Sequence, residues 1–342
     1  MRESTVKSVD TGMSDIEVNL RTRKRFPGLL IVALSLFFLI GEANLASAPQ
    51  TCVAVVMGRF SLEYSEALDG FVEVITKNRA DAELKRFNVD VPAGQIDAIV
   101  QRVRASHPDV ILTVGSMATS EVSSRISDIP IVFSTVLYPV ASGFASSMRS
   151  SGNNITGAAM DVPIDVQFRT LLSVVPRLDK VGVLYNPEET GPIIREAEGV
   201  ARAMGLHLVS EQVRSEKDVP AALDNLFQSN VKALWSVADA AVFTLPSFKF
   251  IVQKTLEKGV PFMGPNDRFT ESGALIALNC DHTDNGRQSG ELALLILEGK
   301  RPADIPIAQP RIVEMTLNLR VARFLGLRIP GNVEREAHRV IR

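Results

Sequence analysis

The sequence predicts an α/β fold of two lobes, each built around a parallel β-sheet. Short β-branched runs bounded by Gly, Pro or Asp alternate with amphipathic segments of about 10 to 15 residues, the pattern of right-handed βαβ units. This alternation occurs in two successive series of similar size. A chain of 342 residues is long enough for about two domains.

The first series begins at Thr51 with a short apolar strand followed by apolar residues at helical spacing. Its strands are expected at residues 51–57, 82–87, 110–114 and 131–135, and its helices at 62–77, 93–105 and 116–126. The second series follows Gly157. Its strands are expected at 181–185, 206–211, 233–237, 261–263, 273–280 and 311–317, and its helices at 165–174, 192–204, 219–228 and 245–257.

A candidate export signal precedes the first strand. Residues 28–40 carry no charge and follow the basic residues Arg21, Arg23, Lys24 and Arg25, as an apolar h-region follows a basic n-region. Thirteen helical residues span about 20 Å, less than the roughly 30 Å hydrocarbon core, so a signal peptide over residues 1–48 is favoured over a membrane anchor. The mature chain is therefore expected in the periplasm, where ATP and NAD chemistry is not expected.

Composition excludes several further classes. With 46% hydrophobic residues, 22% charged residues and a net charge of -2, the chain is globular and nucleic acid is not expected as a partner. Two cysteines exclude a disulfide scaffold, and four scattered histidines lack metal-ligand spacing, so no metal or cofactor is expected. The run Gly286–Gly290 lacks the Gly-Lys core of a phosphate loop and is interpreted as a helix start. Cys52 and Cys280 are predicted to be unpaired and buried.

Several segments, read in order, resemble ABC-transporter substrate-binding proteins of the tryptophan-binding-like family, with the type I periplasmic binding protein fold. They are DVILTVGS (109–116), IPIVFSTVLYP (129–139), NITG (154–157), KVGVLYNP (180–187), GRQSGELALLILEGKRPADIP (286–306) and NLRVARFLGLRIP (318–330). The resemblance implies two Rossmann-like lobes, 51–157 plus 282–308 and 158–281 plus 309–342. It places three crossovers near 157–163, 278–284 and 307–314. It also implies a small-molecule ligand and an ABC permease in the inner membrane as partner; the protein is expected to be a monomer.

Ligands of open parallel sheets bind beyond the carboxyl ends of the strands. Ser116 and the free N–H groups of its helix could hold a carboxylate there, or Ser116 could be a plain N-cap. Asp239 could pair with a ligand ammonium, or cap the segment that follows it. The candidate ligand contacts are Phe60, Gly115, Ser116, Met117, Thr135, Tyr138, Asn186, Asp239 and Asp267.

The leading hypothesis is a periplasmic solute receptor that captures a small ligand by hinge closure and presents it to a permease. An amino acid, aromatic ones included, is the expected ligand. The alternative is a sensory module that passes its ligand signal to a membrane receptor. An extracytoplasmic enzyme is disfavoured, because no nucleophile with a base and no paired carboxylates can be assembled from the sequence, and no catalytic residue is expected.

Overall fold

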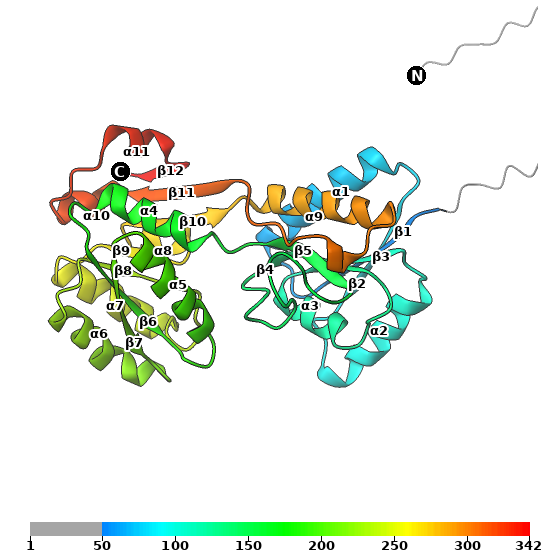
Figure 1. The fold of residues 1–342 in the computed structure, drawn as a ribbon, viewed down its shortest axis with the longest axis horizontal. Helices are drawn as coiled ribbons and strands as arrows, with labels where there is room; N and C mark the ends of the chain where they lie inside the picture. Colours follow the sequence, from blue (N-terminus) through cyan, green and yellow to red (C-terminus); the bar gives the residue numbers. More distant parts are fainter. Residues whose placement is uncertain (1–49) are drawn as a thin grey trace, which may run out of the picture. The chain divides into compact units, whose positions relative to one another are not determined.

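The computed structural model describes residues 50–342; the predicted signal peptide lies outside the described residues. Within this range the chain forms two lobes, each a twisted sheet covered by helices (Figure 1). No helix in the described part of the chain is both long and apolar enough to cross a membrane.

The first lobe is built on a five-stranded parallel sheet in the order β2-β1-β3-β4-β5. Its strands are β1 (Cys52–Met57), β2 (Glu83–Asn88), β3 (Val110–Val114), β4 (Ile131–Val136) and β5 (Ile155–Ala159). β3, β4 and β5 are buried along their whole length, as expected when helices cover both faces of a parallel sheet. The covering elements are α1 (Leu62–Asn78), η1 (Ala93–Gln95), α2 (Ile96–Ala105), α3 (Ser116–Ser123), α9 (His282–Leu297) and η3 (Pro302–Asp304).

The second lobe contains a seven-stranded sheet in the order β12-β11-β10-β9-β8-β6-β7. Its strands are β6 (Lys180–Tyr185), β7 (His207–Gln212), β8 (Ala233–Trp235), β9 (Phe262–Gly264), β10 (Ile276–Cys280), β11 (Val313–Asn318) and β12 (Arg339–Ile341). Its helices are α4 (Ile164–Val174), α5 (Gly191–Ala203), η2 (Glu216–Asp218), α6 (Val219–Gln228), α7 (Leu245–Glu257), α8 (Asp267–Glu271), α10 (Leu319–Phe324) and α11 (Gly331–Glu336).

The predicted parallel sheets are confirmed, with one antiparallel pair in the second lobe, where β11 runs against β10. The chain leaves this sheet at the carboxyl end of β10 to form α9 of the first lobe. It returns at that same end, so β11 has to run back along β10.

The chain passes between the lobes three times, which confirms the predicted three-crossover architecture. The first passage joins β5 to α4 over residues 160–163, and the second is Asp281, between β10 and α9. The third follows the bridge between Ala158 and Ala308 and leads into β11. Each lobe is therefore assembled from separate stretches of the chain.

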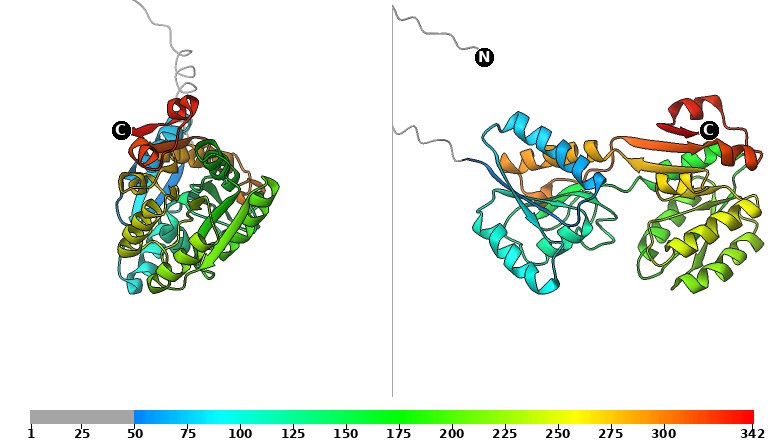
Figure 2. Two further views of the ribbon diagram at one scale, coloured as in Figure 1. Left: turned by 90° about the vertical axis from the view of Figure 1, so that its left-hand side faces the viewer. Right: turned by 180° about the vertical axis from the view of Figure 1, so that it is seen from behind.

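Helices α1 and α9 lie side by side on the first lobe in both figures (Figures 1 and 2). A Cβ atom added at Gly286 would overlap the carbonyl of Ala67, and one added at Gly70 would overlap the carbonyl of Thr283. The interpretation of Gly286 as a helix start is wrong, because Gly286 lies inside α9. The helix begins at His282, where the Asp281 carboxylate accepts the N–H of Asp284 at 2.9 Å, and Gly286 serves close helix packing.

Both cysteines of the chain lie in the described range, and both are free and buried, as predicted. Cys52 begins β1 of the first lobe, whereas Cys280 ends β10 of the second.

Candidate functional site

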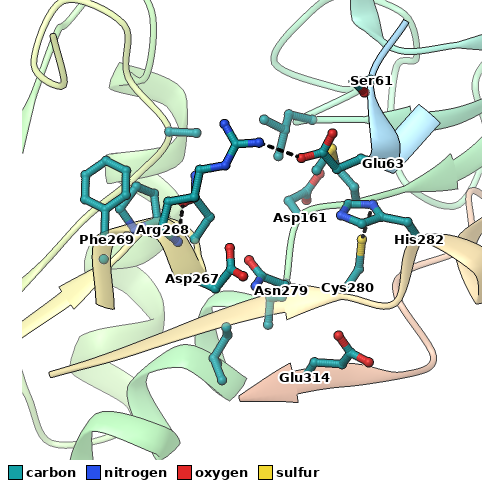
Figure 3. A pocket seen from close by; sticks show the side chains of 18 of the residues that line it. Ser61, Glu63, Asp161, Asp267, Arg268, Phe269, Asn279, Cys280, His282 and Glu314 are labelled. Atoms are coloured by element: carbon teal, nitrogen blue, oxygen red, sulfur yellow. Dashed lines mark hydrogen bonds and ion pairs between the residues drawn. The ribbon is translucent and has the colours of Figure 1, made fainter. Parts of the chain in front are cut away.

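A cavity of about 950 Å³ lies at the carboxyl ends of the parallel strands, with walls from both lobes (Figure 3). The first lobe contributes the segment after β1 and the loop after β4. The second contributes the loops after β8 and β9, and strands β10 and β11. This is the place where α/β sheets bind ligands, because loops and helix starts gather there.

Four of the predicted contacts line this cavity: Phe60, Tyr138, Asp239 and Asp267. Within the described residues, the lining does not include Gly115, Ser116, Met117, Thr135 or Asn186.

The start of α3 lies behind another side chain. The hydroxyl of Tyr64, which lines the cavity, stands so close to Gly115 that an added Cβ there would overlap it. Met117 packs its methyl group against Gly58 in the same way. Tyr64 thus contacts the start of α3 and lines the cavity, whereas Ser116 is not among the lining residues.

Thr135 forms a β-bulge at the end of β4. The register between β4 and β5 shifts between Phe133 and Val136, and Thr135 has φ +54°, unusual for a β-branched residue. Its N–H donates to Oδ1 of Asn285 at 2.9 Å, and its hydroxyl donates to the Ser134 carbonyl at 2.7 Å. Its polar groups are therefore engaged in holding the bulge.

Asp239 joins two loops of the second lobe and is only 3% exposed. Its Oδ2 accepts the Asn186 N–H and the Thr190 hydroxyl, each at 2.6 Å. Its Oδ1 accepts the N–H groups of Ala241 and Val242, each at 3.1 Å. Both carboxylate oxygens thus stabilise the loops after β6 and β8. Asn186 takes part through its backbone.

Asp161 is a cavity residue that sequence reasoning missed, because it lies in a segment interpreted only as a crossover. Its Oδ1 accepts the N–H of Tyr138 at 2.8 Å. Burial raises the pKa of the Asp161 carboxyl, and the Tyr138 N–H opposes that rise only in part. A polar residue directly after a strand and beside a crossover is the signal that could have found it.

Tyr138 connects the lobes. It lies on the loop after β4, has φ +48°, and packs its ring against the core of the second lobe. Its hydroxyl accepts the N–H of Ala238 at 3.3 Å, and burial raises its pKa.

The opposite rim carries an ion pair between the lobes, Arg268 Nη2 to Glu63 Oε1 at 3.1 Å (Figure 3). The pKa of Glu63 is lowered, first by its own backbone N–H at the start of α1. Nearby, His282 Nδ1 lies 3.6 Å from Cys280 Sγ. Burial raises the pKa of this thiol to about 12, so Cys280 is a poor nucleophile. No group of three potential metal ligands occurs among residues 50–342.

One wall of the cavity is aromatic. Phe243 and Phe269 lie 5.6 Å apart in an edge-to-face arrangement, and Phe248 supports Phe269 from behind at 4.2 Å. Phe60 contributes from the first lobe and is 75% exposed. The cavity thus offers apolar contact area beside its carboxylates.

Comparison with known proteins identifies the family to which this two-lobed chain belongs. Residues 63–341 match the family described as ABC transporter substrate binding protein. The chain belongs to this family. As an ABC substrate-binding protein it is a member of a family of small-ligand receptors rather than enzymes, and the predicted family is confirmed.

Among curated proteins, this ABC substrate-binding protein is 25% identical over 231 residues to the tyrosine-binding protein of Clostridioides difficile (strain R20291). The alignment covers 67% of this chain and 66% of that protein, just under two thirds of its length.

Solved structures confirm the type I periplasmic binding protein fold. A Streptococcus pneumonia ABC domain in complex with L-Trp superposes with a TM-score of 0.64 at 20% identity, over 85% of this chain and 100% of that one. A ligand-free, open substrate-binding protein with adhesive properties from Clostridium difficile gives a TM-score of 0.72 at 20% identity, over 85% and 99%.

Proposed function

We propose that the protein is the periplasmic receptor of an ABC importer, and that it captures a small amine-bearing ligand in the interlobe cavity. Amino acids are the first class to test, aromatic ones included. Family membership supports the receptor role, and the named ligands of the tyrosine-binding relative and the L-Trp complex support the ligand class.

The observation that carries the ligand class is the carboxylate of Asp161. It is mostly removed from water, and Oδ1 has the Tyr138 N–H as its donor among the described residues. A desolvated carboxylate favours a charged hydrogen-bond donor, and a ligand ammonium supplies one. Phe243 and Phe269 then offer a surface for an apolar or aromatic side chain.

The position of Asp161 supports the proposed hinge closure. It belongs to the first crossover, and its partner Tyr138 reaches from one lobe to a loop of the other. A ligand bound at Asp161 therefore contacts the segment that must rotate when the lobes approach. In the proposed cycle, the closed, loaded protein docks on the permease.

The test is calorimetric titration of the purified mature protein with tyrosine, tryptophan, phenylalanine and leucine, after native mass spectrometry for a co-purified ligand. Asp161→Asn should weaken binding roughly 10- to 100-fold, as expected for a charge-assisted hydrogen bond of about 1.5–3 kcal/mol. Asp165→Asn is the matched control, because Asp165 lies four residues further along the chain in the first turn of α4, pairs with Arg169 at 2.6 Å and is outside the cavity lining. Equal losses in the two variants would refute the role of Asp161.

The location and the monomeric state are further parts of this proposal. Fractionation of cells that express the full chain should recover a protein shortened by about 48 residues in the periplasm. Light scattering of that product should give the mass of one chain.

A further inference from the structure

We infer that the ligand carries a net positive charge. It is an amine that has no carboxylate group to balance its ammonium. This rests on the proposed function, and it narrows the ligand from amino acids in general to organic cations. The argument compares the acidic and basic groups that face the cavity.

Carboxylates outnumber cations in the lining. Two guanidinium groups face the cavity, those of Arg59 and Arg268, together with the imidazole of His282. Six carboxyl groups face it: Glu63, Glu66, Asp161, Asp239, Asp267 and Glu314. Asp267 has a cationic partner, Arg339 at 3.7 Å, and Glu314 lies 3.3 Å from Nδ1 of His338. Asp161 and Glu66 have no ion-pair partner within the described part of the chain.

The two guanidinium groups of the lining and the start of α1 are already engaged. Arg268 pairs with Glu63 at 3.1 Å, and Arg59 lies 3.6 Å from Asp90. The start of α1 holds two acceptors of its own chain: the Ser61 hydroxyl accepts the Tyr64 N–H at 3.2 Å, and Glu63 interacts with its own N–H. A ligand carboxylate would therefore meet groups that are already neutralised.

A zwitterionic ligand and a cationic ligand are expected to differ in their affinity for this cavity. A zwitterion must bury its carboxylate beside an excess of negative charge, where it gains little and loses its water. An amine without a carboxylate makes the same contact with Asp161 and avoids that loss. Phe243 and Phe269 add aromatic rings to the wall, and such rings attract a cation placed over their faces.

The experiment compares tyrosine with tyrosinamide and tyramine, and phenylalanine with its amide and phenethylamine, by calorimetry at about pH 6.5, where the amines are mostly protonated. The amide and the amine should bind at least tenfold more tightly than the parent amino acid. Equal or tighter binding of the amino acid would overturn the inference while leaving the proposed amine site intact. Binding of none of these compounds would overturn both.

A variant tests the charge argument directly. Glu63→Gln frees Arg268 and the start of α1, so the preference for the amine over tyrosine should fall about tenfold. Glu73→Gln is the control, since it makes the same change on the same helix, where Glu73 pairs with Arg287 at 2.9 Å outside the cavity. An unchanged preference in Glu63→Gln, or an equal fall in both variants, would refute the inference.

Discussion

The close packing of α1 against α9 leads to a prediction about stability. Both helices begin at the cavity, where Glu63 and His282 form part of its wall. Gly286→Ala places a methyl group well inside 3.0 Å of three backbone atoms of Ala67, and backbone cannot move aside as a side chain does. Overpacking of this kind costs about 1–3 kcal/mol and occasionally more. The gain in helix propensity from Gly to Ala returns at most about 1 kcal/mol. Because the overlap is with backbone atoms, the upper end of the overpacking range applies, and the net expectation is a loss of about 2 kcal/mol.

Gly199→Ala is the matched control, because Gly199 lies inside α5 and nothing stands within 4 Å of its added Cβ. The same substitution there should stabilise by up to about 1 kcal/mol. Urea unfolding followed by far-UV circular dichroism gives both values, and fluorescence of the single tryptophan, Trp235, reports separately on the second lobe. A Gly286→Ala protein as stable as wild type would refute the close-packing argument.

Three further outcomes are expected. Because burial raises the folded-state pKa of Asp161, its contribution to the free energy of unfolding is fully present well below pH 3.8 and is lost as the pH rises through that pKa. Thermal melts should therefore show that Asp161→Asn is more stable than wild type at neutral pH but not near pH 3. Cys52 and Cys280 should resist a thiol reagent at about pH 8 in the native protein, and two thiols per chain should react on unfolding; fast native labelling would contradict their burial. Arg311→Leu leaves the buried carboxylate of Asp284 without the guanidinium that lies 2.8 Å away, and should lower the free energy of unfolding in urea by about 2 kcal/mol. Arg311→Lys should recover part of that stability.

Periodicity predicted the elements that repeat the βαβ pattern, and the predicted helix at 219–228 agrees with α6 at both ends. It missed β5, because Thr156-Gly157-Ala158 has small residues where a strand usually shows large apolar ones. It also missed the direction of β11. Strand direction at that edge depends on the route of the chain through the other lobe, which local sequence does not encode.

The candidate site, like the fold, could be predicted only in part from local sequence. Rules about strand ends led to Phe60, Tyr138, Asp239 and Asp267, all of which line the cavity. They could not exclude Ser116, because the residue that lines the cavity at the start of α3 is Tyr64, which comes from a helix more than forty residues earlier in the sequence. Such a long-range contact follows from packing and has no local pattern.

Tyr138 links Asp161, the carboxylate proposed to bind the ligand, to the second lobe: its N–H donates to Asp161, and its hydroxyl accepts the N–H of Ala238. A ligand shifts a conformational equilibrium only by the difference in its affinity for the two states. A desolvated carboxylate provides such a difference, because its charge is least favourable when the lobes exclude water and no cation is present. An ammonium at Asp161 removes that penalty mainly in the closed state. The residue proposed to recognise the ligand is thus also placed to favour closure only when the ligand is bound.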